Sequence, residues 1–422
     1  MSGSAMGSGE NHPAFCQLNG QDPEAVFGSL PTPCYIVDEA GLQRNAEVLA
    51  AVMQRTGCRI LLAQKAFSNY DFYPLLSETL SGTEASGLYE ARLGAEKMPG
   101  KEVHVFCAAY REEEFEELLT YADHIVFNSP AQLRQFGRRA KECGKSIGLR
   151  INPKCSTQED HEIYDPCSST SRLGSTREVW EQEMSEELIA LLDGLHFHTL
   201  CEQNSDALQV TWQAVEAQFA DVLPRMKWVN MGGGHHITRK DYDIALLEKL
   251  ILEVKERYGV EVYLEPGEAV ALNAGYMASR VLDIVHNGEN KIAILDASAA
   301  CHMPDVIEMP YMPPVYGGIA ELEGENSYIL AGPTCLAGDV IGRYGFAKPL
   351  TIGDMVLLGD MAIYSTCKNN TFNGMPLPNI WRRALDGRLD RLTDFGYHDF
   401  FMRLGSTAGR PESFIANSHK MM

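Results

Sequence analysis

Four features of the chain combine reactive or ligand-binding groups with a preceding apolar run. Lys65 could form a Schiff base if burial lowers the pKa of its amine, although a lysine can also simply end a strand. Gly232, Gly233 and Gly234 could present backbone N–H groups to a phosphate, although three glycines can also make a plain turn. Glu265 could tune the electrons of a bound pyridine ring or serve in a structural pair, and His198 ends another of the apolar runs.

Short apolar runs precede or contain these residues, and amphipathic segments alternate with the runs. Apolar residues at helical spacing mark the segments 208–222 and 244–258. Strand–helix alternation predicts an α/β fold with a parallel sheet, and eight runs suggest a closed (β/α)8 TIM barrel. An open doubly wound sheet is the alternative. The eight predicted strands are 59–63, 83–86, 103–108, 124–128, 147–152, 194–198, 228–231 and 262–265.

In such a barrel the chemistry lies at the carboxyl ends of the strands. Six of the eight predicted strands carry a residue with chemical potential there: Lys65, Glu84, Arg150 with Asn152, His198, Gly232–Gly234 and Glu265. A lysine, a phosphate-binding turn and a carboxylate at one barrel mouth are what pyridoxal 5'-phosphate requires. Of the pair His196 and His198, one is expected to be a packing residue and His198 lies nearer the mouth, so a metal pair is disfavoured. We therefore expect this cofactor and no metal.

Beyond Gly275 the helical periodicity fades, and short runs at 291–296, 328–331 and 355–358 predict an antiparallel β domain. We expect a flexible segment at 1–15, a barrel over 38–275, and a second domain built from 16–37 with 276–422. A tail at 381–403 is expected to be partly helical.

The composition excludes several classes of function. The 422 residues contain 36 Lys and Arg against 57 Asp and Glu, a net charge of −21, which argues against nucleic-acid or anionic-membrane partners. No apolar run is long enough to span a membrane, and no secretory signal is seen. Eleven scattered cysteines without a Cys-x-x-Cys motif predict free thiols in a reducing cytoplasm.

These motifs resemble, in order, those of the alanine-racemase-like (fold type III) pyridoxal-phosphate decarboxylases of basic amino acids. The resemblance spans about Pro31 to Gly374. Its motifs are Pro33-Cys34-Tyr35, Ala63-Gln64-Lys65, Gly82 to Glu90, Arg150 to Pro153, His196-Phe197-His198, Gly232–Gly234, Glu265-Pro266-Gly267, Gly332 to Cys335 with Gly338-Asp339, Gly359 to Tyr364, and Thr371 to Gly374.

The resemblance implies a role for each matching residue. Lys65 would attach the cofactor, His198 would stack on its ring, and Glu265 would pair with the ring nitrogen. Gly232–Gly234 and Tyr364 would hold the phosphate. Cys335 would cross from the partner subunit of a homodimer and handle the proton at Cα, so that the active sites lie at the subunit interface.

Departures from the common pattern narrow the resemblance. Glu268 stands where Arg usually follows Glu-Pro-Gly, and Leu336 stands where an acidic residue commonly follows the cysteine. With His235-His236, 301–305 and 308–311, these departures most resemble the carboxynorspermidine/carboxyspermidine decarboxylases of polyamine biosynthesis. The implied substrate is a cationic polyamine-type amino acid. Carboxylates should therefore line its distal pocket, and the candidates are Glu268, Asp305 and Glu308.

Three alternatives remain at this point. A diaminopimelate decarboxylase of lysine biosynthesis would share the fold, but it needs a cationic pocket for a second carboxylate. A racemase of the same fold would have Tyr at the position of Cys335. A cofactor-binding regulator would not need Lys65, Glu265 and Cys335 together.

Overall fold

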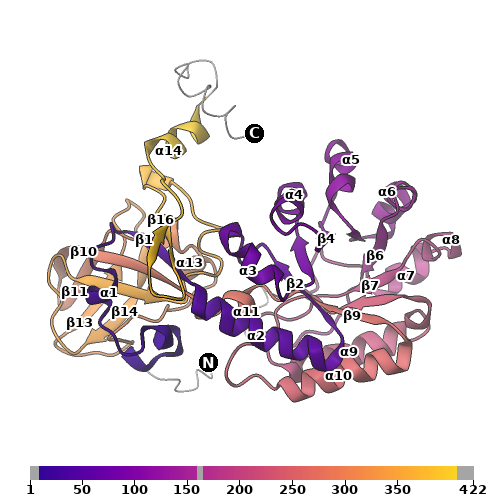
Figure 1. Ribbon diagram of the computed structural model, residues 1–422, viewed down its shortest axis with the longest axis horizontal. Coiled ribbons are helices and arrows are strands. Elements are labelled where there is room, and N and C mark those ends of the chain that lie inside the picture. The colour runs from indigo at the N-terminus through magenta and orange to yellow at the C-terminus, as the bar shows by residue number, and fades with distance from the viewer. Residues whose placement is uncertain (1–8, 159–164, 406–422) are drawn as a thin grey trace. The chain divides into compact units, whose positions relative to one another are not determined.

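The computed structural model describes residues 9–158 and 165–405 and divides the chain into two compact units (Figure 1). The barrel unit comprises Asp38–Gly275 and Ala362–Cys367. The sheet unit comprises the residues up to Val37, Tyr276–Met361 and those from Lys368 onward. The segment Ala362–Cys367, which the sequence analysis placed in the second domain, thus groups with the barrel and carries Tyr364 there.

Within the described residues, eight parallel strands close into a barrel, which confirms the predicted fold class. The strands are β2 (Arg59–Ala63), β3 (Gly82–Ala85), β4 (Glu102–Phe106), β5 (His124–Phe127), β6 (Ser146–Arg150), β7 (Gly194–His196), β8 (Trp228–Asn230) and β9 (Glu261–Leu264). Arg59 opposite Tyr263 closes β2 on β9. The open doubly wound alternative is wrong, because its edge strands would not pair.

Helices cover the outside of the barrel (Figure 1), among them α2 (Glu39–Thr56), α9 (Ser205–Phe219) and α10 (Ile244–Tyr258). Local sequence fixes their ends. The Asp38 side chain accepts a hydrogen bond from the Gly41 amide at the start of α2, and Gly57 ends that helix in the left-handed region, at φ 65°. The apolar stripes face inward, as the buried Leu208, Val215 and Phe219 of α9 illustrate.

The remaining helices around the barrel are shorter. They are α3 (Tyr73–Ser77), α4 (Leu88–Lys97), α5 (Glu112–Tyr121), α6 (Pro130–Glu142), α7 (Arg177–Glu183), α8 (Glu186–Ile189) and α11 (Glu268–Ala271).

Trp228 fills part of the barrel interior. Its indole packs with Leu61, Val126 and Tyr263. Two neighbouring strands place glycines against it, because a Cβ at Gly148 or Gly194 would lie 2.4 or 2.1 Å from the indole ring. A packed interior of this kind leaves the strand ends as the place for a site.

The sheet unit contains a mostly antiparallel sheet, as predicted. Along its path the strands run in the order β12 (Gly318–Ala320), β14 (Val340–Phe346), β13 (Ser327–Ala331), β11 (Asn290–Leu295), β10 (Gly275–Asn287), β1 (Cys34–Asp38), β16 (Asn379–Arg383) and β17 (Leu389–Arg391). The strand β15 (Met355–Gly359) also pairs with β10, and β11 runs parallel to β13.

The two ends of the chain differ in part from expectation. Residues 1–8 of the segment expected to be flexible lie outside the described residues. Residues 9–15 are ordered instead, because Phe15 is buried in a core cluster with Tyr276 and Leu357. The tail expected to be partly helical begins with the hairpin β16–β17 and reaches a helix only at α14 (Tyr397–Leu404).

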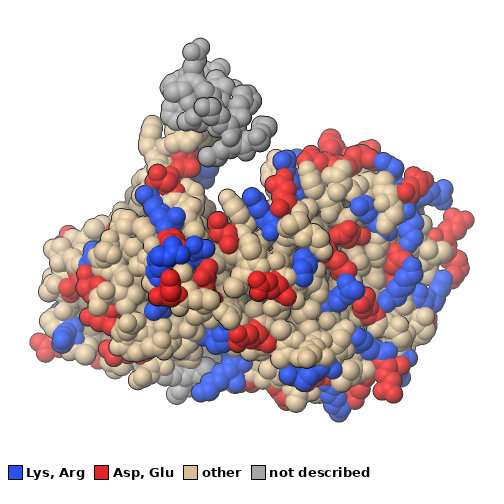
Figure 2. Space-filling model, viewed as in Figure 1, with Lys and Arg blue, Asp and Glu red and all other residues tan. Residues whose placement is uncertain are grey.

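Acidic and basic side chains are interspersed over the face drawn in Figure 2, so the excess of acidic residues does not segregate there. None of the helices in the described part of the chain has both the length and the hydropathy needed to cross a bilayer.

Candidate functional site

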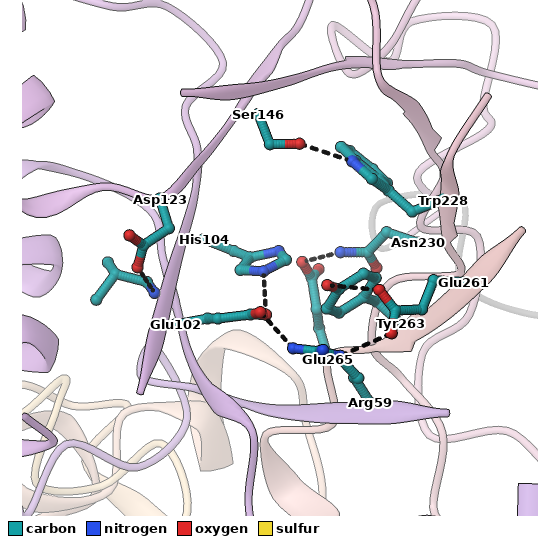
Figure 3. A network of polar contacts seen from close by, with 11 residues as sticks. Arg59, Glu102, His104, Asp123, Ser146, Trp228, Asn230, Glu261, Tyr263 and Glu265 are labelled. Carbon is teal, nitrogen blue, oxygen red and sulfur yellow. Dashed lines mark hydrogen bonds and ion pairs between the residues drawn. The ribbon is translucent and has the colours of Figure 1, made fainter. Parts of the chain in front are cut away.

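A buried carboxylate stands at the mouth of the barrel, directly after β9. Glu265 is 6% exposed, and the His196 ring donates to its Oε2 at 3.1 Å while the Asn230 amide donates to its Oε1 at 2.6 Å. Figure 3 shows the Asn230 amide directed at this carboxylate. Burial alone would raise the pKa of Glu265, but the charge and hydrogen bond of His196 outweigh burial and lower it to about 2. The carboxylate is therefore ionised at neutral pH.

His196 and Asn230 are functional candidates that the sequence analysis missed. One histidine of the pair was expected to be a packing residue, but β7 ends at His196 and its ring contacts Glu265. The available signal was the position of His196 and Asn230 at the ends of β7 and β8, the two strands that precede β9 in the barrel.

A glycine turn follows β8 at the same mouth. Gly232 and Gly234 have φ of 68° and 80°, in the left-handed region. The Gly232 N–H donates to Asn230 Oδ1 at 2.9 Å, and the Gly233 N–H donates to His198 Nδ1 at 2.7 Å. A Cβ on Gly233 would lie 2.5 Å from the Glu265 carbonyl oxygen, so only glycine allows the turn to lie this close to the end of β9.

Alanine at Gly234 is expected to destabilise the chain well beyond the cost of its backbone conformation. Its Cβ would lie 2.1 Å from the Leu200 carbonyl oxygen, whereas Gly100 has the same φ of 80° and open space around it. Gly100→Ala should therefore cost about 1–2 kcal/mol, and Gly234→Ala more than about 3 kcal/mol. Thermal unfolding of the two variants measures the difference. Equal losses would show that the turn relaxes without cost.

Lys65 follows β2 and is exposed, whereas a buried amine was expected there. The positive charge of Lys65 acts to lower the pKa of nearby ionisable groups, among them Glu84 and His198. The neighbouring Glu84 is buried in β3, and its Oε2 has no hydrogen-bond partner among the described residues. Burial raises the pKa of Glu84 well above its usual value, against the opposing charge of Lys65.

His198 and Arg150 line the same mouth. Burial lowers the pKa of His198 well below its usual value, and the charges of Lys65 and Arg150 act in the same direction. The ring is therefore neutral, and because Nδ1 accepts from Gly233, its proton lies on Nε2. The Arg150 guanidinium lies 4.5 Å from the Phe106 ring centroid and donates to the His198 carbonyl oxygen at 3.2 Å.

The segment Ala362–Cys367 brings Tyr364 to the loop that carries the lysine. The Tyr364 N–H donates to the Ala66 carbonyl oxygen at 2.9 Å, and Cys367 lies 3.1 Å from the hydroxyl of Ser68. The barrel unit therefore contains six predicted cofactor-binding positions, with Tyr364 in addition: Lys65, His198, Gly232, Gly233, Gly234 and Glu265.

Each predicted substrate carboxylate already contacts a cationic or ionisable partner. Glu268, in the barrel unit, accepts from the His236 ring at 2.7 Å. Asp305 and Glu308, both in the short helix α13 (Asp305–Glu308) of the sheet unit, form ion pairs with Lys368. A cationic substrate at either place would have to compete with the existing partner.

Cys335 belongs to the sheet unit and is exposed. Its N–H donates to Asn373 Oδ1 at 2.9 Å, which ties the Cys335 segment to the neighbouring turn at 372–374. The apolar side chains of Leu336 and Phe372 beside it are 44% and 46% exposed. The sheet unit thus presents a thiol together with uncovered apolar surface.

Polar side chains also occupy the barrel interior at the amino ends of the strands (Figure 3). Arg59 forms ion pairs with Glu102 and Glu261, and Glu102 contacts His104 at 3.2 Å. Glu102, His104 and His124 form the one group in the described residues whose potential metal-ligating atoms lie within 4.8 Å of one another. The two imidazoles are stacked 3.9 Å apart at 13°, so their nitrogens do not converge on one ion.

Comparisons with known proteins agree on one family. The family model described as "Pyridoxal-dependent decarboxylase, C-terminal sheet domain" matches residues 34–362. The carboxynorspermidine/carboxyspermidine decarboxylase of Campylobacter jejuni is 41% identical over 388 residues, which cover 89% of this chain and 99% of that protein. The carboxyaminopropylagmatine decarboxylase of Synechocystis sp. is 38% identical, over 90% of this chain and 97% of its own length.

Solved structures agree with the sequence relatives. The carboxynorspermidine decarboxylase of Campylobacter jejuni, solved with norspermidine, is 40% identical with a TM-score of 0.81, and the match covers 89% of this chain and all of that one.

Among the sequence relatives, the diaminopimelate decarboxylase of Haemophilus influenzae is more distant, at 26% identity over 81% of this chain.

Proposed function

We propose that this chain, which belongs to the pyridoxal-dependent decarboxylases and within them to the family of the carboxynorspermidine/carboxyspermidine decarboxylases, releases CO2 from a polyamine-type amino acid. The products would be norspermidine or spermidine, and the enzyme would serve polyamine biosynthesis. Its cofactor is pyridoxal 5'-phosphate.

One observation carries the decarboxylase function. An exposed lysine amine, a glycine turn and an ionised buried carboxylate follow β2, β8 and β9, which are neighbours in the closed barrel. Each of the three matches one part of the cofactor: its aldehyde, its phosphate and its ring nitrogen. The residues present therefore fit pyridoxal phosphate.

We assign the roles on that fit. Lys65 would attach the cofactor, Glu265 would keep its ring nitrogen protonated, and the neutral His198 would lie against its ring. Gly232–Gly234 and Tyr364 would hold the phosphate. The pairing of Glu265 with His196 supports its role, because a carboxylate that stays ionised stabilises a positive charge beside it.

When bound, pyridoxal phosphate supplies an electron sink for the electron pair left at Cα as CO2 departs. The protein then has to deliver one proton to Cα. We assign this proton to the thiol of Cys335, with the amine of Lys65 as the second candidate. Cys335 must therefore lie near the substrate, whereas its own segment belongs to the sheet unit.

We further propose a homodimer in which Cys335 completes the site of the partner subunit. The exposed thiol and the exposed apolar side chains beside it support this arrangement, since an interface would cover them. We place the enzyme in the cytoplasm. All eleven cysteines lie within the described residues as free thiols, which a reducing compartment maintains.

The substrate should be cationic at its far end. Asp305, Glu308 and Glu268 remain the proposed carboxylates for its amines, with Lys368 or His236 as the partner to be displaced. A second candidate substrate is carboxyaminopropylagmatine, because the Synechocystis relative named for it is nearly as similar as the Campylobacter jejuni protein. Diaminopimelate is disfavoured by the lower identity of the enzymes that use it.

Release of CO2 from a panel of substrates tests the function. We expect the highest kcat/KM for carboxynorspermidine or carboxyspermidine among these two, carboxyaminopropylagmatine, diaminopimelate, ornithine and arginine. A preference for carboxyaminopropylagmatine would change the proposed product, and a preference for diaminopimelate would overturn the polyamine function. Each substrate should be measured with saturating cofactor, so that cofactor loss does not mimic poor recognition.

A further inference from the structure

A buried histidine–glutamate pair lies beside the proposed phosphate-binding turn. His236 follows Gly234 by two residues, and its Nε2 donates to Oε2 of Glu268 at 2.7 Å. His236 is 7% exposed, and the side chain of Glu268 is 15% exposed. The Thr238 hydroxyl also donates to the Ala269 carbonyl oxygen at 2.6 Å, so the loop after the turn is held along α11 at two points.

The charges of Glu268 and His236 affect how well an anion can bind at the Gly232–Gly234 turn. Glu268 is three residues beyond Glu265, whose backbone packs against Gly233, so an uncompensated carboxylate at position 268 would repel a phosphate dianion. Burial by itself lowers the pKa of His236. The hydrogen bond and the charge of Glu268 outweigh burial and raise the pKa above its usual value. Of the other charged groups that face this ring, Glu202 favours the imidazolium and Arg239 opposes it.

The second ring nitrogen of His236 needs an acceptor. Nδ1 is buried and has no hydrogen-bond partner among the residues that the structure describes. In an imidazolium this nitrogen carries a proton, and a buried donor without an acceptor is unfavourable. A phosphate oxygen is an acceptor of matching charge.

We infer that His236, held as an imidazolium by Glu268, supplies the positive charge that binds the cofactor phosphate at the Gly232–Gly234 turn. The inference rests on the proposed function, because it assumes that this turn holds the phosphate. It explains how a chain with Glu268 after Glu-Pro-Gly can bind an anion at the glycine turn. The imidazolium of His236 balances the charge of Glu268, and its ring offers the anion a hydrogen-bond donor.

Two other roles of the His236–Glu268 pair predict different experimental results. If the pair only fastens the loop to α11, its loss should weaken binding of the whole cofactor, with or without a phosphate. If the proposed contact of Glu268 with a substrate amine is the whole role of the pair, changes at the pair should raise KM and leave cofactor affinity unchanged.

Comparison of pyridoxal 5'-phosphate with pyridoxal, which lacks the phosphate, separates these roles. The full-length chain is freed of cofactor and titrated with each compound, with absorbance as the readout. We expect His236→Gln to weaken binding of pyridoxal phosphate about 10- to 100-fold and to change binding of pyridoxal less than about threefold.

His235→Gln is the matched control. His235 is the adjacent buried histidine, and its Nε2 contacts the Met231 carbonyl oxygen at 3.3 Å. Burial lowers its pKa to about 4, so its ring is neutral and contributes no charge. We expect the ratio of the two affinities to stay at the wild-type value.

A second variant covers the case in which glutamine disturbs the loop. Glu268→Arg combined with His236→Gln should restore the preference for pyridoxal phosphate to within about tenfold of wild type, because a guanidinium replaces the lost cation. Equal weakening of both compounds by His236→Gln without rescue, or no weakening of either, would overturn the inference. No substrate is present in this titration, so its result does not depend on the proposed substrate. If His236→Gln changes the ratio of the two affinities but no polyamine-type amino acid releases CO2, the inference stands and only the proposed function is refuted.

Discussion

Replacement of Lys65 by alanine is expected to abolish covalent attachment of the cofactor and to lower kcat by at least about 10³-fold, because a covalent catalyst without its nucleophile retains only binding effects. The lysine is exposed after β2, and the charge of its ammonium group acts to lower the pKa of Glu84, Glu90 and His198. Its amine is therefore accessible to an incoming aldehyde. Reduction with borohydride followed by peptide mass spectrometry locates the attached cofactor.

Lys97→Ala is the control for this experiment. Lys97 is also an exposed lysine of the barrel unit, and its ammonium group lies 4.6 Å from the centroid of the Tyr70 ring. We expect this variant to keep both attachment and activity. If Lys65→Ala still carries the cofactor on another lysine after reduction, the assignment of Lys65 is wrong.

Replacement of Cys335 by alanine is expected to lower kcat about 10²- to 10⁴-fold, the usual contribution of a proton donor, while the cofactor stays attached. The loss should therefore appear in CO2 release and in the proton incorporated at Cα, and the absorbance of the bound cofactor should persist. Cys16→Ala, which removes another exposed thiol of the sheet unit, should have little effect. Unchanged turnover in Cys335→Ala would leave Lys65 as the proton donor.

Mixing the two inactive variants tests the proposed shared site. If Cys335 completes the partner's site, a mixed dimer of Lys65→Ala and Cys335→Ala has one intact site and one doubly defective site. Random exchange makes about half of the dimers mixed, so about a quarter of the wild-type activity should return. If Cys335 acts within its own subunit, every site keeps one defect and mixing restores nothing. CO2 release after co-expression, with the mass of the assembly measured in parallel, distinguishes the two arrangements.

The arrangement at the barrel mouth was largely readable from the sequence. Lys65, Gly232–Gly234 and Glu265 each follow a short apolar run, and in a parallel barrel all strands end at the same face. The repeating strand–helix pattern therefore determined both the fold class and the face on which these residues lie. The closed barrel of the structure confirms that fold class.

The partners that tune these residues could not be read in the same way. Glu265 binds His196 and Asn230, which are 69 and 35 residues away, because barrel closure aligns β7, β8 and β9. The role of His196 was missed, because a local pattern does not show that its ring reaches Glu265. The exposure of Lys65 was also missed, because an apolar run predicts a buried strand and not the environment of the residue beyond it.

The sequence by itself determined the order of the strands, the residues at their ends and the cofactor that these residues fit, because apolar periodicity and motif spacing are local properties of the chain. Only the tertiary structure decided which charges are paired. It joined Glu268 to His236 and Lys368 to both Asp305 and Glu308. Such pairs form between residues 32 to 63 positions apart, where distance in space depends on how the elements pack and not on spacing along the chain.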